Sequence, residues 1–445
     1  VSAGTGNVTL SLVAVGSTLV ENFSVGSSVT YNNDADPPNI TITPTNSLSA
    51  DTVYAISYPS GAFTQSGAGG SFVGAGYTFD TMSLQNVLYG TAKWRDGSQG
   101  NNDSSPDYSS PVQVAGGKVW DIATQDDFNG FGVIDGTLWG WGNNDKGTLG
   151  VNDKAHRSSP IQIPGTTWES PTVNRTNYSS ALVSKTDGTL WSWGMNFLGD
   201  LGQNNRTAYS SPVQIPGTTW GTPMAGVRNI VGKTDGTLWM WGDNGTGQLG
   251  QNQPNNSHTS SPVQIPGTNW SQGNKKYGAG AGTAALKTNG TLWAWGNNYA
   301  GQLGQNNLTQ YSSPVQIGSD TTWSLLSVGN HGGAAIKTDG TLWMWGYNYY
   351  GSLGQNEANN VGNRSSPTQI PGTWSNVAYG YGSVKALKTD GTAWAWGVNG
   401  YGQLGINVAG ANHRSSPVQL PGTSYTMTGL IQSNRSENVA LFKQI

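Results

Sequence analysis

The chain has 445 residues, of which 10% are charged, and its formal net charge at pH 7 is −3. A typical soluble domain has roughly a quarter of its residues charged, so this sequence is unusually poor in charge. It contains 65 Gly and 20 Pro but no Cys, which excludes a disulfide framework, a thiolate metal site and a cysteine nucleophile. No apolar run approaches the ~18 residues needed to cross a bilayer, so we predict no membrane insertion.

The first part of the chain differs in composition from the rest. Lys, Arg and His are absent before residue 93, five acidic residues give that stretch a formal charge of −5, and the first tryptophan is Trp94. This double shift predicts a boundary between about 80 and 92, with residues 1–83 and 84–445 as two domains. Alternating β-type segments between Gly, Asn and Pro clusters predict a small β-sandwich-like domain at the start. We expect it to anchor the protein or to mediate self-association.

Beyond the boundary the chain repeats itself with a period near fifty residues. A Ser-Ser-Pro motif recurs at spacings of 49 to 53 residues, beginning at Ser109, Ser158, Ser210, Ser260, Ser312, Ser365 and Ser415. A second motif, D-G-T-L-W-x-W-G, begins at Asp135, Asp187, Asp235, Asn289, Asp339 and Asp390, with Asn in the fourth copy. There are therefore seven copies of the first motif and six of the second.

Each unit is predicted to hold about four short antiparallel strands. Asp-Gly or Asn-Gly between extended runs, as in residues 285–295, predicts a hairpin with a type I′ turn. In the strand after the turn, paired tryptophans such as Trp191 and Trp193 share one face and are expected to pack between sheets. A G-Q-L-G turn, a variable polar loop and the S-S-P-V-Q-I strand follow. A fourth strand, such as 325–328, precedes the next hairpin.

Short strands repeated around an axis are typical of a β-propeller. The missing seventh D-G-T-L-W unit predicts how the ring closes. The segment 438–443 is similar to the strand before Asp-Gly, and the segment 88–94 is similar to the strand after it. We therefore predict an all-β fold with seven blades, one of which is shared between both ends of the repeat region and removes the open sheet edge.

The recurring pattern D-G-T-L-W-x-W-G-x-N-x-x-G-Q-L-G resembles the RCC1 (regulator of chromosome condensation) repeat over about residues 86–445. The resemblance implies a seven-bladed propeller closed by such a shared blade, and it does not extend to the first eighty or so residues. Members of that family include a nuclear exchange factor for a small GTPase that docks on chromatin, secreted bacterial inhibitors of β-lactamase, and many repeat proteins without an assigned role. The resemblance therefore implies a scaffold and leaves the function open.

The residues argue against two classes of function. Binding to nucleic acid needs cationic loops, whereas the most basic short cluster is Lys275-Lys276, so we predict no nucleic-acid partner. Catalysis needs a convergent acid, base or nucleophile, and none stands out. Three of the four histidines, His156, His258 and His413, lie two residues before Ser-Ser-Pro, which places them on different blades as loop residues. We therefore predict no enzymatic activity.

No cofactor or metal is predicted from the sequence. The Asp of each Asp-Gly is explained by turn conformation. Asn- and Asp-rich loops at 143–145 and 32–34 have oxygen ligands of the kind that Ca²⁺ takes, but they lack the spacing of known calcium loops. Whether calcium binds there is left open.

A binding surface is the remaining class. Between W-G and the G-x-L-G turn lie variable residues that include several large aromatics, and exposed aromatics in polar loops are typical of protein or carbohydrate recognition. The alternative is that these side chains fold back onto the neighbouring blade. The predicted binding residues are Phe197, Leu198, Tyr299, Tyr349, Tyr350 and Tyr401.

These observations favour a non-enzymatic extracellular or virion surface protein, with a bacteriophage tail or capsid-surface component as the first expectation. Its propeller loops would bind a receptor, a glycan or a neighbouring subunit. A secreted protein-binding inhibitor similar to the β-lactamase-inhibiting propellers and a bacterial surface or filament adhesin are the alternatives. A polysaccharide hydrolase would need a pair of carboxylates that the sequence does not reveal.

Overall fold

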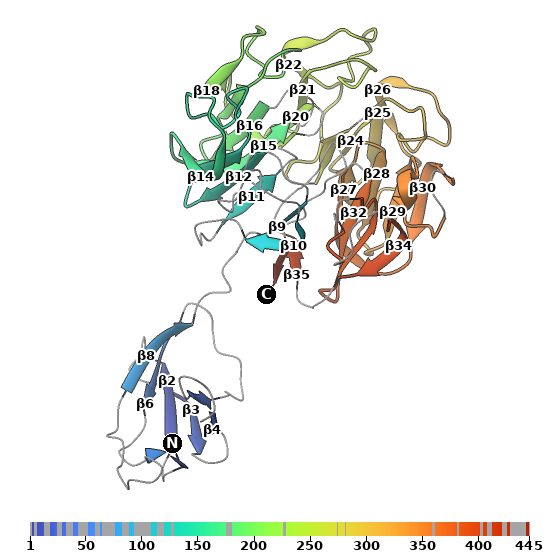
Figure 1. Cartoon of the computed structure of the whole chain (residues 1–445). Helices are drawn as coiled ribbons and strands as arrows, with labels where there is room; N and C mark the ends of the chain where they lie inside the picture. Colours follow the sequence, from blue (N-terminus) through green and yellow to red (C-terminus); the bar gives the residue numbers. More distant parts are fainter. Residues whose placement is uncertain are drawn as a thin grey trace. The chain divides into compact units, whose positions relative to one another are not determined.

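A computed structural model describes residues 120–420, apart from 126–128, 175–179, 226–227, 274, 281, 358–360, 381, 401–403 and 407–411, together with the backbone of strands before and after that range. The chain divides into two compact units, Val1–Gln85 and Asn86–Ile445 (Figure 1).

The first unit contains β-strands throughout its described backbone. Its main sheet has the antiparallel order β3-β2-β6-β8, formed by β2 (Asn7–Leu12), β3 (Thr18–Ser24), β6 (Thr52–Ser57) and β8 (Gly76–Thr81). Two further pairs are β1 (Ser2–Ala3) with β7 (Phe63–Thr64) and β4 (Val29–Asn32) with β5 (Asn39–Ile42). The predicted sandwich-like packing depends on side chains that lie outside the described residues.

The second unit contains six four-stranded antiparallel sheets, each formed by four consecutive strands. Sheets 1 to 3 are β11 (Ile122–Gln125), β12 (Asn129–Ile134), β13 (Thr137–Gly142) and β14 (Arg157–Ile163); β15 (Trp168–Asn174), β16 (Ser180–Lys185), β17 (Leu190–Gly194) and β18 (Tyr209–Ile215); and β19 (Trp220–Ala225), β20 (Asn229–Lys233), β21 (Leu238–Gly242) and β22 (Thr259–Gln264). Sheets 4 to 6 are β23 (Tyr277–Ala279), β24 (Gly282–Leu286), β25 (Leu292–Gly296) and β26 (Tyr311–Gln316); β27 (Trp323–Val328), β28 (Gly332–Lys337), β29 (Leu342–Gly346) and β30 (Arg364–Ile370); and β31 (Trp374–Tyr379), β32 (Ser383–Lys388), β33 (Ala393–Gly397) and β34 (Arg414–Gln419).

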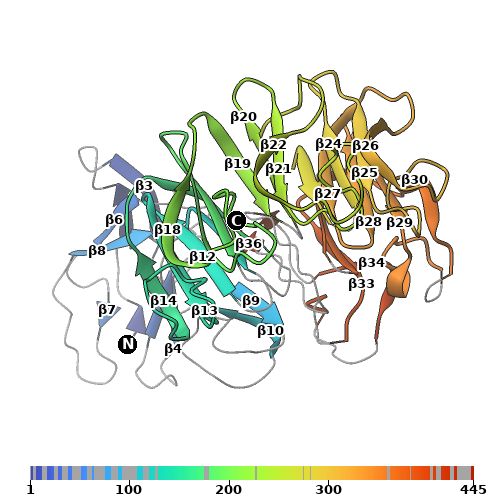
Figure 2. The same ribbon diagram turned by 90° about the horizontal axis from the view of Figure 1, so that it is seen from above.

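The six sheets are arranged in chain order around a common axis, as Figures 1 and 2 show. The first strand of each sheet contacts the first strand of the next, so these strands lie innermost, and the fourth strands lie at the periphery. Because connections alternate between the two ends of an antiparallel meander, the Asp-Gly turns share one end of the unit. The loops between third and fourth strands share the opposite end, which we call the loop end.

The hydrophobic core lies between consecutive sheets. Between sheets 4 and 5, for example, Leu303 and Ile317 from one sheet pack with Leu326 and Trp345 from the other. The second tryptophan of each W-x-W pair is fully buried there, as predicted. The first tryptophan, such as Trp343, packs against the same core but is half-buried. The two members of each pair therefore differ in burial.

In sheets 2 to 6 this second tryptophan also donates a hydrogen bond to the preceding sheet. Its Nε1–H donates to the backbone carbonyl of the second residue of that sheet's G-x-L-G turn. The five described bonds are Trp193 to Thr148 (2.6 Å), Trp241 to Asp200 (2.9 Å), Trp295 to Gln248 (2.7 Å), Trp345 to Gln302 (2.9 Å) and Trp396 to Ser352 (3.0 Å). Because buried indole N–H groups and carbonyls need partners, the same bond recurs at each of these interfaces.

The predicted type I′ turn occurs in sheet 1 and is wrong for the other five sheets. In sheet 1 Asp135 (φ 47°) and Gly136 (φ 71°) are both left-handed. In the others a lysine and a threonine flank three loop residues, as in sheet 2, where the Gly188 N–H donates to the Lys185 carbonyl at 3.0 Å. There the glycine is left-handed and the preceding Asp or Asn is not. One additional loop residue thus gives a type I turn followed by a G1 bulge.

The lysine before each of these five turns lies over two tryptophans of its own sheet. In sheet 6 the Lys388 Nζ lies 5.3 Å from the ring centroid of Trp374 and 4.1 Å from that of Trp394. The two indoles are nearly perpendicular at 78°. Equivalent arrangements surround Lys185, Lys233, Lys287 and Lys337. These cation–π contacts use most of the lysines at this end of the unit for internal packing.

The two ends of the second unit form separate two-stranded sheets. β9 (Tyr89–Ala92) pairs with β10 (Tyr108–Gln113), and β35 (Tyr425–Met427) pairs with β36 (Phe442–Gln444). These strands include parts of the two segments that were predicted to share one sheet. Residues 438–441 lie outside the described residues, so the four-stranded shared sheet stays a prediction.

Candidate functional site

The loops at the loop end, hereafter the long loops (residues 143–156, 195–208, 243–258, 297–310, 347–363 and 398–413), are organised by a buried asparagine. In sheet 4 the Asn298 Nδ2 donates to the backbone carbonyls of Asn307 (3.0 Å) and Thr309 (2.9 Å), and its Oδ1 accepts from the Leu303 N–H at 2.9 Å. The same Asn-to-Leu bond occurs in the other five sheets. The W-G-x-N motif therefore supplies an internal brace for each long loop.

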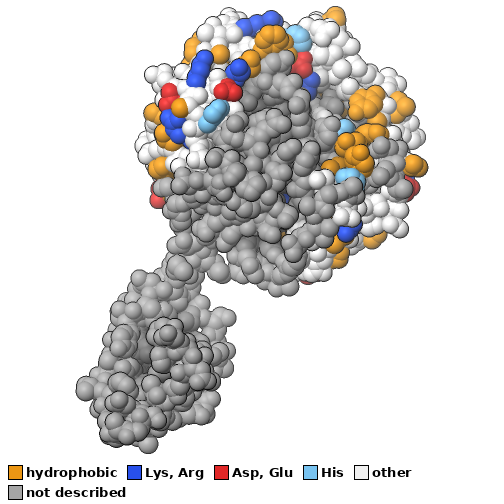
Figure 3. All heavy atoms as spheres, viewed as in Figure 1, with side chains coloured by type: hydrophobic (Ala, Val, Ile, Leu, Met, Phe, Trp, Pro, Cys, Tyr) orange, Lys and Arg blue, Asp and Glu red, His pale blue; other side chains and the backbone are white. Residues whose placement is uncertain are grey.

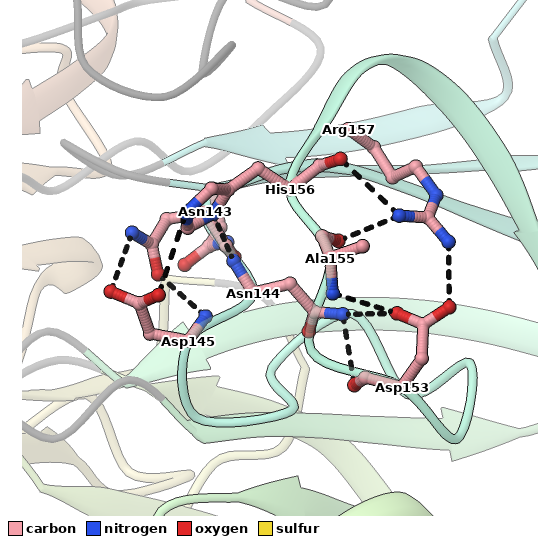
Figure 4. Close-up of polar contacts among 8 residues, drawn as sticks. Asn143, Asn144, Asp145, Asp153, Ala155, His156 and Arg157 are labelled. Atoms are coloured by element: carbon pink, nitrogen blue, oxygen red, sulfur yellow. Dashed lines mark hydrogen bonds and ion pairs between the residues drawn. The ribbon is translucent and has the colours of Figure 1, made fainter.

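Figure 4 shows this brace in sheet 1. The Asn144 Nδ2 donates to the Asp153 carboxylate at 2.9 Å, and the Asn144 N–H donates to His156 Nδ1 at 3.0 Å. The Arg157 guanidinium pairs with Asp153 at 2.6 Å. The backbone N–H of Ala155 and this guanidinium hold the pKa of the Asp153 carboxyl below its usual value. The Asp153 carboxylate is thus held by Asn144, Ala155 and Arg157.

The long loops of sheets 1 to 5 are also attached to the next sheet. In sheet 4 the Asn306 N–H donates to the Ser365 carbonyl of sheet 5 at 2.6 Å, and the backbone of Asn306 is left-handed (φ 57°). Asparagine tolerates this conformation better than most residues. The equivalent bonds join Asn152 to Ser210, Asn204 to Ser260, Asn252 to Ser312 and Asn356 to Ser415. The long loops are therefore fixed at both their centres and their sides.

Replacing Asn298 with alanine is expected to loosen the long loop of sheet 4 and to lower the free energy of unfolding by about 2 kcal/mol, because buried carbonyls and an N–H lose their partner. Hydrogen exchange of the Leu303 amide is expected to become faster in Asn298→Ala. The neighbouring Asn297→Ala, which removes one bond to the Tyr299 N–H, is the control. Equal exchange of Leu303 in both variants would contradict the bracing role.

The structure places the predicted binding residues differently from one another. Phe197 and Tyr299 project from the long loops of sheets 2 and 4, with 57% and 58% of their surface exposed. Leu198 is half-buried. Tyr401 lies outside the described residues. Leu308 and Val361, which sequence reasoning did not select, are exposed in the same set of loops. Hydrophobic side chains also gather on part of the described surface in Figure 3.

Tyr349 and Tyr350 fold against the next sheet, which is the alternative that the sequence left open. They lie in η1 (Tyr349–Gly351), where Tyr350 stacks on His413 of sheet 6 with ring centroids 4.1 Å apart. Tyr349 lies 4.9 Å from His331 and 4.5 Å from Tyr350 between ring centroids. These side chains are half-buried or buried, so the structure gathers two of the predicted residues into an aromatic cluster.

Three of the histidines serve the long loops, as their shared sequence position predicted. His156, His258 and His413 each accept a backbone N–H on Nδ1 at 3.0 Å, from the asparagine that braces the loop. In sheet 5 the Asn363 Oδ1 takes the same role at 2.9 Å. Histidine and asparagine are therefore interchangeable acceptors at this position.

Sequence reasoning missed a buried ionic group at the loop end. The Arg228 guanidinium pairs with Asp243 at 2.5 Å and donates to the Gly280 carbonyl of sheet 4 at 3.2 Å. Burial raises the pKa of Asp200, which lies in the G-x-L-G turn of sheet 2. Aligning the repeats offers a signal, because other sheets have Gly, Ser or Asn at the position of Arg228. The group joins sheets 2 to 4; Asp200 is buried, whereas the Asp243 side chain keeps 18% of its surface exposed.

The remaining charged candidates are also used internally. The Lys275 Nζ donates to the Val377 carbonyl at 3.0 Å, and burial lowers the pKa of this ammonium to about 7. The Lys276 Nζ donates to the Ser324 carbonyl. In sheet 1 the Asp145 carboxylate bonds Asn143 and lies 3.4 Å from His156 Nε2. Within the described residues no three His, Asp or Glu side chains form a metal-binding group, and no helix is long and apolar enough to cross a membrane. Asn33 and Asp34 lie outside the described residues.

A family model matches six segments that together span more than half of the chain. The model is the regulator of chromosome condensation (RCC1) repeat, and the segments are residues 135–170, 187–221, 235–274, 289–336, 339–387 and 390–428. Each segment begins at the Asp-Gly or Asn-Gly turn.

Curated relatives match over shorter stretches. The RCC2 homolog of Danio rerio is 38% identical over 84 residues, which is 19% of this chain and 17% of that protein. The ultraviolet-B receptor UVR8 of Arabidopsis thaliana is 28% identical over 231 residues, which is 50% of this chain and 52% of that protein. The chain thus spans between about a sixth and a half of the length of these relatives.

Solved structures share the fold. Yeast RCC1 (Prp20), in a crystal structure with Kap60, has a TM-score of 0.67 at 16% identity, covering 81% of this chain and 89% of that chain. Human WBSCR16 has a TM-score of 0.65 at 18% identity, covering 80% of this chain and 98% of that chain. At this identity the likeness concerns the arrangement of the sheets.

Proposed function

The chain belongs to the RCC1 repeat family, and from this premise we propose that it is a non-enzymatic extracellular or virion surface protein, such as a phage tail or capsid-surface component. Its propeller binds a receptor, a glycan or a neighbouring subunit through the long loops. The observation that carries the proposal is the presentation of Phe197 and Tyr299, more than half exposed, on loops that are braced by buried asparagines. Rigid exposed aromatics give contact area at a low entropic cost.

The charge distribution supports binding over catalysis. The described histidines of the long loops act as hydrogen-bond acceptors for the loops themselves, and the Asp243 carboxylate pairs with the Arg228 guanidinium. Lys275 and Lys276 are occupied by backbone carbonyls, which disfavours a phosphate-binding role. A charge-poor, polar surface with a few exposed apolar side chains suits recognition of a neutral or mixed partner surface.

We further propose that a seventh sheet closes the propeller. The pair β35-β36 supplies its first two strands, and the pair β9-β10 supplies the last two, so that β36 bonds to β9. The seven Ser-Ser-Pro motifs against six D-G-T-L-W motifs support this shared sheet. Residues 1–83, which contain the β3-β2-β6-β8 sheet, then precede the ring as the part that anchors the chain or joins copies of it.

The proposed location is tested on native material. Antibody fragments against the repeat region are expected to label intact particles or cell envelopes, since the protein is proposed to sit on a surface. Finding the chain inside cells, unattached to particles or envelope, would overturn the location.

The binding role is tested with purified full-length protein on intact cells of the source or of its host. The double variant Phe197→Ser with Tyr299→Ser is expected to reduce binding by about tenfold or more, since central aromatic contacts carry much of an interface's energy. Thr166→Ala, an exposed position in the connection between sheets 1 and 2, is the control. Equal binding by the double variant and the control would overturn a role for these loops.

A further inference from the structure

The aromatic cluster at the loop end consists of His331, Tyr347, Tyr349, Tyr350 and His413, contributed by sheets 5 and 6. From Tyr349 the ring centroids of Tyr350, His331 and Tyr347 lie 4.5, 4.9 and 5.9 Å away. Tyr350 in turn stacks on His413 at 4.1 Å with an angle of 25° between the rings. The three tyrosines and His413 keep part of their surface exposed. Within the described residues these contacts gather aromatic rings from two sheets.

The backbone is shaped to allow this cluster. Tyr350 has φ 48° and ψ 38°, a left-handed conformation that is costly for a bulky residue. The equivalent described residues, Lys146, Leu198, Thr246 and Ala300, are not left-handed. Tyr349 lies over Gly382 of sheet 6, where a Cβ would approach the Tyr349 ring to 2.8 Å. Sheet 5 thus has a strained backbone at Tyr350, and sheet 6 has a glycine, Gly382, where a side chain would collide with Tyr349.

The cluster carries neutral polar groups. The His413 Nδ1 accepts the Asn399 N–H at 3.0 Å, so its ring is held in a fixed orientation. Burial lowers the pKa of both His331 and His413 below the usual value, which keeps both imidazoles uncharged at neutral pH. The ionic side chains of the same long loop, Arg364 and Glu357, pair with each other at 2.5 Å. The cluster therefore presents phenol and imidazole groups, which can form hydrogen bonds without carrying a charge.

We propose that this aromatic cluster is a binding site for a neutral carbohydrate. The inference rests on the proposed binding role of the loop end and names the ligand class of one site there. A sugar ring has apolar C–H faces that pack on aromatic rings and hydroxyls that bond to phenol and imidazole groups, which matches this combination of side chains. The more exposed side chains of Phe197 and Tyr299 offer a larger contact area to a protein partner. The half-buried rings of the cluster offer less area, which suits a small ligand such as a sugar. The cluster itself contains no Lys, Arg, Asp or Glu side chain, which favours neutral over acidic sugars. The adjacent Arg414 guanidinium donates to the backbone carbonyls of Asn412 and His413.

The repeats supply the variant that tests this site. His413→Asn removes the ring that stacks on Tyr350 but keeps the acceptor for the Asn399 N–H, as Asn363 does naturally in sheet 5. His156→Asn makes the same change in sheet 1, away from the cluster. Tyr350→Asn removes the tyrosine ring and tolerates a left-handed backbone, whereas Tyr350→Phe keeps the ring. Thermal unfolding of each variant establishes that it folds.

The probes are the soluble hexasaccharides of maltose, cellulose, chitin and mannan type, titrated calorimetrically into the full-length protein, with an acidic heparin-derived hexasaccharide for comparison. At least one neutral probe is expected to bind with a Kd of about 1 mM or below. His413→Asn and Tyr350→Asn are expected to weaken that binding by about tenfold, a loss equivalent to one good aromatic contact. His156→Asn is expected to leave it within about threefold, less than the loss of one such contact, and Tyr350→Phe, which removes only the phenol hydroxyl, is expected to weaken it less than Tyr350→Asn does.

Three results would overturn the inference. They are no binding of any neutral probe, unchanged binding in His413→Asn and Tyr350→Asn, and preference for the acidic probe. If the neutral probes fail while the Phe197 and Tyr299 double variant still loses binding to cells, the sugar site is wrong and the proposed function stands. If the probes bind at the cluster and the double variant retains cell binding, the sugar site stands and the role of Phe197 and Tyr299 in cell binding is wrong.

Discussion

Replacing Trp345 with alanine is expected to lower the free energy of unfolding by about 3 to 5 kcal/mol, the usual cost of removing a large aromatic from a core. The Trp345 side chain is fully buried between sheets 4 and 5, and its indole N–H bonds the Gln302 carbonyl at 2.9 Å. The truncation therefore leaves both a cavity and an unsatisfied buried carbonyl. Urea unfolding followed by circular dichroism measures the change.

The neighbouring tryptophan provides the control. Trp343 is half-buried, and its indole bonds Thr341 within the same sheet, so Trp343→Ala is expected to cost about 1 to 2 kcal/mol. Trp345→Phe keeps most of the ring volume and removes the donor, for which we expect a loss of about 1 to 3 kcal/mol. If Trp345→Ala and Trp343→Ala cost the same, the bond between sheets does not have the weight assigned to it.

His331 is expected to make the stability of the protein depend on pH between about 6.5 and about 4. Its side chain is 7% exposed, and burial lowers its pKa from 6.5 to about 4. Below pH 6.5 the unfolded chain binds a proton at this residue while the folded chain does not, so the free energy of unfolding falls as the pH is lowered through this window. The loss approaches about 3 kcal/mol once the pH reaches the folded pKa.

The variant His331→Phe isolates this contribution, because it keeps an aromatic ring and cannot bind a proton. Urea midpoints at pH 7.5 and pH 4.5 are expected to fall more for the unmodified protein than for His331→Phe. The carboxyls of the Asp-Gly-Thr turns, such as Asp339, have pKa values lowered by hydrogen bonds from threonine, so they titrate below this window and do so equally in both proteins. Parallel behaviour of the two proteins would show that His331 takes up its proton in the folded state at an ordinary pH.

Local patterns in the sequence were sufficient to predict much of the fold. The period near fifty residues and the W-x-W spacing predicted repeated antiparallel sheets with buried tryptophans, because both are set by neighbours along the chain. The turn type was wrong in five sheets because it depends on where strand pairing stops, and Lys185 and Thr189 enclose one more residue than Ile134 and Thr137 do. The sequence pattern contains the same Asp-Gly in both cases.

The site was harder to predict because its residues are far apart in the sequence and come together only in the folded protein. The sequence selected Tyr349 and Tyr350 as loop aromatics, but their stacking with His413 and His331 depends on how sheets 5 and 6 pack together. The ion pair between Arg228 and Asp243 likewise requires knowing which backbone positions face each other across the loop end. Contacts between residues far apart in the sequence were therefore not predictable, whether they join sheets 5 and 6 or lie within sheet 3.

The attachments between successive sheets also bear on how such a chain diversifies. In almost every described unit a tryptophan bonds to the preceding sheet and a left-handed asparagine bonds to the following sheet. Both residues bond to main-chain atoms. Main-chain acceptors do not change when a codon changes, so a mutation in a variable loop position leaves the joint with its neighbours intact. Single repeat units can therefore be duplicated, exchanged or mutated in their loops without loss of the bonds between sheets. Selection on recognition is then largely separated from selection on folding.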